Sequence, residues 1–449
     1  MRDILVTLLV AGTLPFILRR PYIGALMWVW IGVMNPHTQA WGFAVNFPFA
    51  AIIAGVTIVS LIFNNVPKSL PLTPVVMVLI AFVFWMNVTT LLAIHPDLVY
   101  DQWNRVMKVM LMTFVVLMLI KTKLHIQLLI GVLVFSLSYY GVKGGIFTIV
   151  GGGEHLVWGP GASYISGNNE IALALIMIIP LLHYFQVISK KIWMRYSLTV
   201  AMVLCAVAAL GSYSRGALLA IAAMGLFLWL KSQHKVRLAL LFILTIPLML
   251  AFMPEQWNQR MDTIEHYEQD RSVAGRFNAW AMAFNLAKDR PFVGAGFEIT
   301  QRELFERYAP KVENGVLVQA RTAHSIYFQA LGEHGFVGLG LYLLLGFLTW
   351  RMGTWIIRNT RGLNEYQWAF SLASMIQVSL IGFAIGGAFL SLLYFDVPYY
   401  LMIAMVATRR TVEKELKEKA ALAIPVKRTN SSPQLGKPEP LRPITRDSG

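Results

Sequence analysis

One histidine of this chain stands where proton-transfer chemistry would be expected. His324 occurs in the run Ala323-His324-Ser325, where a long polar stretch ends and an apolar stretch begins. Imidazole is the side chain best suited to accept or donate a proton near neutral pH. We therefore predict that His324 is catalytic and lies at one face of a membrane; the alternative is a structural histidine at the start of a helix.

Arginines near the same face predict an anion site. Arg215 lies between two apolar runs, in a Ser-Arg-Gly turn. An unpaired guanidinium inside a membrane costs about 2.5 to 3.5 kcal/mol, so Arg215 requires an anionic partner unless it only extends outward to water. A guanidinium can grip phosphate oxygens with two hydrogen bonds. Arg276 and Arg321, in the polar stretch before the histidine, could approach the same ligand, and two or three such groups would bind a diphosphate.

Weaker candidates lie elsewhere in the chain. Lys108 follows Arg105 by three residues, hence on the same helix face, and could add positive potential to the site or simply extend to water. Asn168 and Asn169 follow Gly167 and could bind a sugar or cap the next helix.

Glu333 and His334 lie nine and ten residues beyond His324. Along a continuous helix that separation is about 14 to 15 Å, at 1.5 Å per residue. We therefore exclude both from the site unless the helix breaks.

The elements that must position these residues are membrane helices. Hydrophobic residues make up 57% of the 449 residues, charged residues 14%, and the mean hydropathy is +0.59. These values fit an all-α, polytopic integral membrane protein. Runs of about 20 apolar residues predict spans, and we count about twelve transmembrane helices, or thirteen, at 47–63, 72–94, 104–120, 124–141, 171–187, 196–213, 216–231, 238–253, 325–350, 366–388 and 392–408, with a short pair at 4–18 and 22–34.

The distribution of lysine and arginine predicts the orientation. Short loops that are rich in these residues mark the cytoplasmic side, which leaves the turn at Arg215 and a large loop at 254–324 in the periplasm. The predicted domains are N-terminal transmembrane helices (1–253), a helix-containing periplasmic loop domain (254–324), C-terminal transmembrane helices (325–408) and a disordered cytoplasmic tail (409–449) that opens with a short charged helical pattern. The net charge of +15 reflects this topology and the tail, and we predict no nucleic-acid binding because the cations form no stripe with interleaved aromatics.

The periplasmic loop predicts an amphipathic helix at 274–290. Phe277, Trp280, Ala281, Phe284 and Ala287 share one face of it. Arg276 borders that face, so the pattern predicts a helix lying on the membrane surface with a cation at its edge. The Gly-containing segment 291–297 then predicts a turn toward the bilayer.

Taken together, the motifs resemble those of the bacterial O-antigen ligase family, within a superfamily that also contains O-antigen polymerases and protein O-oligosaccharyltransferases. The family pattern is His, then Asn, Ser or Gln, nine residues, Gly, two residues and Gly, and the chain matches it from His324-Ser325 to Gly335 and Gly338. A Ser-Arg-Gly turn is matched at Arg215, and Gly-Arg-x-x-x-Trp at Gly275 to Trp280. The resemblance covers about residues 150 to 350, whereas the first 140 residues support it only by hydropathy.

The resemblance implies a glycosyltransferase of the bacterial inner membrane. Its donor would be a polysaccharide on undecaprenyl diphosphate and its acceptor a sugar hydroxyl of lipid A-core, joined at the periplasmic face, with membrane lipid as a further partner. Arg215 and Arg276, with Arg321 and Lys108, would bind the diphosphate and stabilise the leaving group; His324 would accept the proton of the acceptor hydroxyl or orient that hydroxyl. We predict no cofactor and no metal, because no outer loop has an Asp-x-Asp pair, and a single displacement would invert the anomeric carbon.

Two alternatives remain open on the sequence. A polymerase or a protein O-oligosaccharyltransferase would differ from a ligase only in the acceptor. A transporter or flippase of lipid-linked glycans is a different class, which would predict internal repeats and charges near the membrane midplane. No convincing repeat occurs, and the notable cations gather at the predicted outer face.

Overall fold

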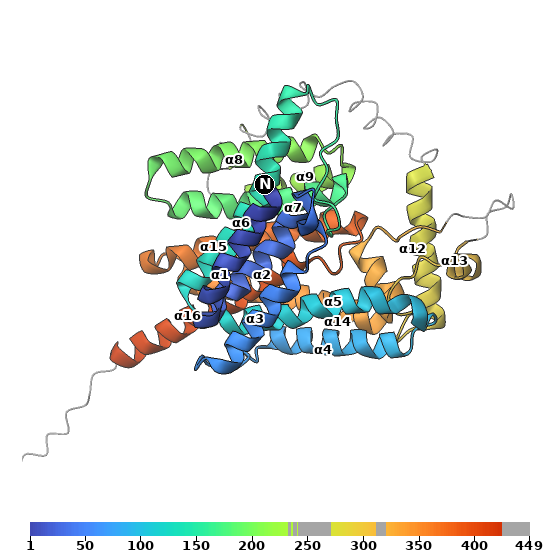
Figure 1. Cartoon of the computed structure of the whole chain (residues 1–449), viewed down its shortest axis with the longest axis horizontal. Coiled ribbons are helices and arrows are strands. Elements are labelled where there is room, and N and C mark those ends of the chain that lie inside the picture. Colours follow the sequence, from blue (N-terminus) through green and yellow to red (C-terminus); the bar gives the residue numbers. More distant parts are fainter. Residues whose placement is uncertain (232–234, 237–239, 241–270, 311–319, 424–449) are drawn as a thin grey trace, which may run out of the picture. The chain divides into compact units, whose positions relative to one another are not determined.

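The computed structural model describes residues 1–231, 235, 236, 240, 271–310 and 320–423 (Figure 1). These residues form helices without strands, which confirms the all-α prediction for the described part of the chain. The helices are α1 (Arg2–Arg19), α2 (Pro21–Met34), η1 (Pro36–Gln39), η2 (Phe43–Val45), α3 (Phe49–Phe63), α4 (Pro74–Leu91), α5 (Pro96–Leu119), α6 (Lys123–Val150), α7 (Asn168–Ile188), α8 (Ile192–Leu210), α9 (Arg215–Lys231), α12 (Arg271–Asp289), α13 (Arg302–Tyr308), α14 (Ile326–Thr360), η4 (Asn364–Tyr366), α15 (Gln367–Gly386), η5 (Gly387–Phe389) and α16 (Asp396–Ala423).

The helices are those of a multi-pass membrane protein. Among the described residues, seven helical segments are long and apolar enough to cross a membrane: α4, α5, α6, α7, α8, α14 and the segment Asn364–Phe389 that contains α15. Apolar helices at Pro21–Met34, Phe49–Phe63 and Arg215–Leu230 are shorter than the roughly 20 residues that a span needs. The count of twelve or thirteen spans therefore remains a prediction, and nearly all of the expected run at 238–253 lies outside the described residues.

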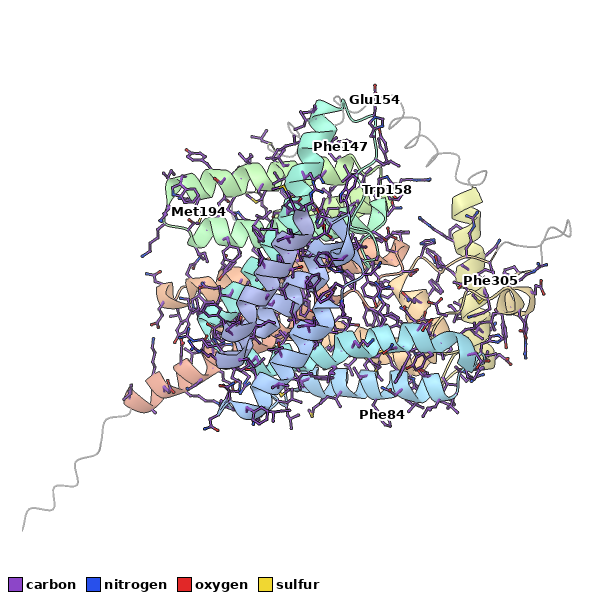
Figure 2. The ribbon with its side chains drawn as sticks, in the orientation of Figure 1. Phe84, Phe147, Glu154, Trp158, Met194 and Phe305 are labelled. Atoms are coloured by element: carbon purple, nitrogen blue, oxygen red, sulfur yellow. The ribbon has the colours of Figure 1, made fainter. Side chains whose placement is uncertain are left out.

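Large apolar side chains cover the outside of several helices. Phe84 on α4 is 65% exposed, and Phe147 and Met194 point outward from α6 and α8 (Figure 2). Such surfaces fit contact with lipid. Inside, α7 packs against α6, α8, α9 and α15, and two thirds of its span is buried.

Small residues bring α6 and α8 close together, as is common between membrane helices. A Cβ atom added at Gly145 would lie 2.4 Å from the carbonyl oxygen of Leu204, and one added at Gly141 would lie 2.3 Å from Cys205 Sγ. No larger residue fits at these positions without moving one helix away from the other.

Helix α14 breaks at Gly335, which corrects the expectation of a continuous helix after His324. Gly335 has φ 69° and ψ −171°, a left-handed backbone that favours glycine. The turn predicted at 291–297 is present and fills the break: Ala295 N donates to Gly332 O (2.9 Å), and Phe336 N donates to Pro291 O (2.8 Å). The backbone groups freed by the break are thereby satisfied.

The two glycines of the sequence motif have separate steric reasons. A Cβ atom at Gly335 would lie 2.3 Å from the Phe292 carbonyl oxygen, and one at Gly338 would lie 2.2 Å from His334 Cβ. The two glycines of Gly-x-x-Gly therefore leave the space that the helix break and the turn packed into it require.

The amphipathic helix predicted at 274–290 is α12, which ends just before Pro291. Ala287, which was predicted to share the apolar face, is buried, but the rest of the buried face consists of other residues. Ala279, Met282, Ala283 and Leu286 form a small core with α13 and neighbouring loops, whereas Phe277 and Phe284 are 55% and 43% exposed. The helix thus has two apolar faces, only one of which is covered by the residues that the structure describes.

Residues 413–449 form a second unit, and its described part is helical up to Ala423. Pairs at i,i+4 stabilise this segment, with Lys417 Nζ 3.0 Å from a Glu413 carboxylate oxygen and Lys414 Nζ 3.8 Å from Glu418. The charged helical pattern is confirmed, so the tail predicted to be disordered from 409 begins as a helix; residues 424–449 lie outside the described part.

Candidate active site

One polar cavity brings together residues from five distant parts of the sequence. It has a volume of 220 Å³ and is lined by Asn169, Tyr213, Ser214, Arg215, Gly216, Arg276, His324, Phe389 and Leu390. Among the lining side chains are two guanidinium groups and one imidazole, and no carboxylate occurs among these lining residues. This lining, with cationic groups and no carboxylate, suits an anion.

His324 enters the cavity from a constrained backbone. Its φ is 42°, a conformation that is uncommon outside glycine and often marks a functional site. The preceding residue is held in place because Trp280 Nε1 donates a hydrogen bond to Ala323 O at 2.7 Å. Trp280 is itself stacked on Phe328, with ring centroids 5.0 Å apart.

The electrostatic surroundings favour the neutral imidazole. Burial, followed by the nearby positive charges of Arg276 and Arg321, lowers the pKa of His324 below its ordinary value. A neutral imidazole at neutral pH is able to accept a proton.

Arg215 is the first residue of α9, and the turn before it is firmly held. Ser214 Oγ accepts a hydrogen bond from Ala217 N at 3.2 Å, in the manner of a helix N-cap. Asn168 Nδ2 donates to Ser212 O at 2.8 Å, and Tyr213 Oη donates to Gly153 O. The N-terminal turn of α9 thus lines the cavity, and its partial positive charge adds to that of the guanidinium.

Arg276 reaches the cavity from α12, and Arg321 lies beside it. A Cβ atom added at Gly275 would be 3.2 Å from Cδ and Nη1 of Arg321. The glycine of the Gly-Arg-x-x-x-Trp motif therefore leaves room for a second arginine next to the first. Arg321 is exposed and lies near the imidazole of His324, but it does not line the cavity.

The predicted site residues fall into three groups. Arg215, Arg276, Asn169 and His324 share the cavity, and Arg321 is adjacent to it. Neither Asn168 nor Lys108 lines it: the amide of Asn168 is occupied by Ser212, and Lys108 is exposed on α5. Their roles as catalytic, diphosphate-binding or sugar-binding residues remain predictions.

Several residues near the cavity carried no sequence signal of their own. Phe389 and Leu390 come from η5 and the residue after it, in the short gap between two predicted spans. Glu170 follows Asn169 on α7 and lies close enough to Arg276 for their charges to interact. Only their proximity in the fold relates these residues to His324.

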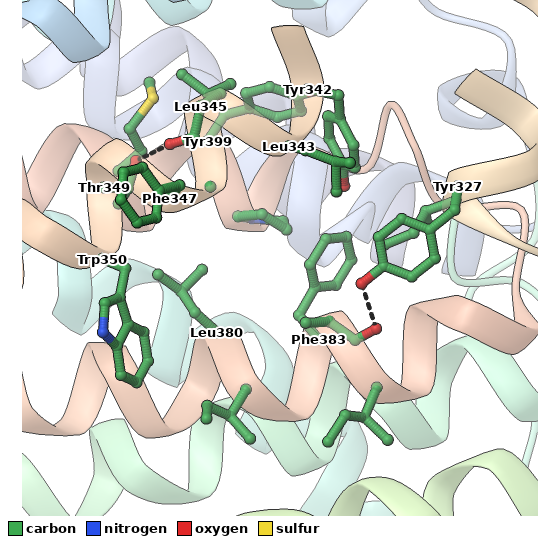
Figure 3. Close-up of a pocket in the computed structure, with 17 residues that line it drawn as sticks. Tyr327, Tyr342, Leu343, Leu345, Phe347, Thr349, Trp350, Leu380, Phe383 and Tyr399 are labelled. Atoms are coloured by element: carbon green, nitrogen blue, oxygen red, sulfur yellow. Dashed lines mark hydrogen bonds between the residues drawn. The ribbon is translucent and has the colours of Figure 1, made fainter. Parts of the chain in front are cut away.

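A second cavity, of 420 Å³, lies between α14, α15 and α16 (Figure 3). Tyr327, Leu380, Phe383 and Trp350 contribute to an almost entirely apolar lining. At one end Tyr327 Oη donates to Ala384 O at 2.7 Å. Ile326 also lines the apolar cavity and is only two residues after His324, which lines the polar cavity. The two cavities are therefore neighbours.

Glu333 and His334 belong to a buried network and not to the His324 cavity. His334 shares hydrogen bonds with Thr89 Oγ1 (2.7 Å) and Tyr394 Oη (2.6 Å), and Tyr394 Oη donates to the Glu333 carboxylate. Gln329 Nε2 completes the set at 3.3 Å from Glu333 Oε1. The helix breaks after His334, so the residues between Ile326 and His334 stay helical, and neither Glu333 nor His334 lines the polar cavity.

Comparison with protein families gives two matches that lie side by side in the sequence. Residues 1–190 match a family of unknown function (DUF5935). Residues 200–343 match the family described as O-antigen ligase, and this part includes both cavity arginines, His324 and the two motif glycines. A search of curated proteins finds no match. Residues 200–343 are therefore similar to the O-antigen ligase family, which confirms the resemblance found in the sequence motifs.

Proposed function

We propose that this protein is an O-antigen ligase, a glycosyltransferase that moves a polysaccharide from undecaprenyl diphosphate to a sugar hydroxyl of lipid A-core. The observation that carries the proposal is the cavity in which Arg215, Arg276 and His324 meet from separate segments. A diphosphate leaving group and an attacking hydroxyl need this combination of cations and a base. We place the reaction at the periplasmic face of the bacterial inner membrane.

The proposed reaction is a single displacement. The acceptor oxygen forms a bond to the anomeric carbon, the bond from that carbon to the diphosphate oxygen breaks, and the diphosphate leaves with the electron pair. His324 takes the proton of the acceptor hydroxyl or orients it, while Arg215 and Arg276 stabilise the charge on the leaving group. Attack opposite the leaving group inverts the anomeric configuration, and no metal ion is required.

The lowered pKa of His324 supports its part in this scheme, because the imidazole is then neutral at the pH of the periplasm. The N-terminus of α9 supports the diphosphate site, because helix N-termini favour phosphate groups. The apolar cavity beside the polar one has the chemistry to hold part of the isoprenoid chain of the donor.

The nearest alternatives share this geometry. A polymerase or a protein O-oligosaccharyltransferase would use the same diphosphate site with another acceptor. A transporter would bind the same donor without bond cleavage. Acceptor identity and bond cleavage therefore have to be measured.

The test uses cells that lack this chain and produce O-antigen. They are complemented with the natural protein, with His324→Ala, or with His183→Ala as a matched control. His183 is exposed on α7, 14 residues after the cavity residue Asn169 and thus about 21 Å further along that helix. We expect polymer-bearing lipid A-core to return with the natural protein and the control, and polyprenyl-linked polymer to accumulate with His324→Ala. A loss of chain length alone would indicate a polymerase, and full restoration by His324→Ala would contradict the catalytic role.

A further inference from the structure

The face of α12 that the described part of the chain leaves exposed is a row of apolar side chains. Phe277, Ala281, Phe284 and Lys288 follow the spacing of one helix face, opposite to the buried Met282 and Leu286. Phe277 and Phe284 are 55% and 43% exposed. Two aromatic rings of this size, two turns apart on one helix face, are costly to leave in water.

The row continues onto the neighbouring turn and onto α14. Phe292, in the turn after α12, is 68% exposed, and Phe336 on α14 is 43% exposed. The rings of Phe284 and Phe336 meet edge to face with centroids 6.4 Å apart. Phe336 belongs to a helix long and apolar enough to span a membrane, so the aromatic row continues onto a helix with the composition of a membrane span.

A cation borders the row, as is common on helices at a membrane interface. Lys288 Nζ lies 5.3 Å from the centroid of the Phe284 ring. Long basic side chains of this kind cover apolar surface with their carbons while the charged end reaches the headgroups.

The direction of α12 agrees with this placement. The axes of helices α4 and α5 are aligned with each other, and α12, in yellow, lies crosswise to them near their ends (Figure 1). If α4 and α5 cross the bilayer, α12 lies along its surface.

We propose that the face formed by Phe277, Phe284, Phe292 and Phe336 inserts among the acyl chains of the outer leaflet. This face anchors α12 in the bilayer interface, and Arg276, which precedes Phe277, is thereby held at the level of the headgroups. The proposal is independent of the reaction that the cavity catalyses.

Site-directed spin labelling in proteoliposomes tests the anchor. Cys205 is the only cysteine and is fully buried, so single-cysteine variants are made in a Cys205→Ala background. Labels are placed at Phe277→Cys, Phe284→Cys and Phe292→Cys, and accessibility to oxygen, which enriches in lipid, is compared with accessibility to a water-soluble nickel chelate. Arg302→Cys on α13, whose side chain is 71% exposed, is the aqueous control, and Phe347→Cys in α14 is the lipid control.

We expect oxygen to relax the labels at 277, 284 and 292 more strongly than the nickel chelate does, as at 347, with the opposite order at 302. The depth calculated from the ratio should fall about 5 to 10 Å into the boundary between headgroups and acyl chains. Labels at the three positions that are as accessible to nickel as that at 302 would show a face in water. Labels shielded from both reagents would show a face covered by protein, such as a second copy of the chain. Either result would overturn the proposal.

Discussion

At the scale of single residues, the pH dependence of the reaction reports on the charges around His324. Arg276 and Arg321 both lower the pKa of this imidazole, and a base with a lowered pKa stays active as the pH falls. Arg321→Gln removes one positive neighbour and should raise the pKa, so the acidic limb of the rate profile moves to higher pH. The rate of glycan transfer by the purified protein, measured from pH 5 to 8, shows whether the acidic limb moves. Arg302→Gln, which changes an exposed arginine on α13, is the control. An unchanged limb would mean that His324 does not act as the titrating base.

Arg215 is expected to act on the leaving group. Arg215→Ala should reduce kcat about 100- to 1000-fold, the usual loss when one donor to a developing negative charge is removed. Arg215→Lys keeps the charge but not the paired hydrogen bonds of the guanidinium, so its rate should be intermediate. Steady-state kinetics with the lipid-linked donor measure both variants. A lysine variant as fast as the natural protein would contradict a bidentate role, and one as slow as the alanine variant would contradict a contribution from the charge alone.

At the scale of elements, the break in α14 should be sensitive to a single substitution. Gly335→Ala places a side chain on a left-handed backbone, at about 1 to 3 kcal/mol, and against the Phe292 carbonyl. Gly340, in the same helix, has no neighbour within 4 Å of a built Cβ, so Gly340→Ala should be neutral or slightly stabilising. Thermal unfolding in detergent, followed by a thiol-reactive dye on the buried Cys205, compares the two. Equal midpoints would mean that the break tolerates a side chain.

The apolar cavity between α14, α15 and α16 should affect donor binding. Gly346 lines it and has no neighbour within 4 Å of a built Cβ, so Gly346→Leu fills space without a clash. If the isoprenoid chain lies there, KM for the polyprenyl donor rises several-fold while kcat is kept, and Gly340→Leu has no such effect. An unchanged KM for Gly346→Leu would place the chain elsewhere.

At the scale of the whole molecule, the sequence predicted the helices and part of the site for identifiable reasons. Apolar runs mark most helices because the bilayer imposes composition as well as length. Three site residues are recognisable in the sequence, either because a polar residue lies among apolar ones or because the residue is part of a short motif. They are Arg215, Arg276 and His324. These signals are local, and the cavity is lined by the residues that carry them.

The remaining features depend on contacts between distant segments. The break at Gly335 exists because the turn at 291–297 packs into it, and the motif alone does not show that partner. Asn168 is a candidate sugar ligand in sequence but its amide holds the Ser212 carbonyl. On α12, Phe277 and Phe284 have the spacing of one helix face, yet Met282 and Leu286 form the core. Periodicity shows that a face is apolar, but it does not show whether protein or lipid covers that face.

The most direct test of the central claim is transfer by the purified protein in proteoliposomes. A polyprenyl-diphosphate-linked glycan and lipid A-core are supplied with a chelator of divalent metals, and products are identified by mass spectrometry for the natural protein, His324→Ala and His183→Ala. We predict glycan joined to lipid A-core and released polyprenyl diphosphate with the natural protein and His183→Ala, and neither product with His324→Ala. Transfer by His324→Ala at the rate of the natural protein would contradict the account. So would a donor that binds to the protein in the proteoliposomes but stays intact in every sample.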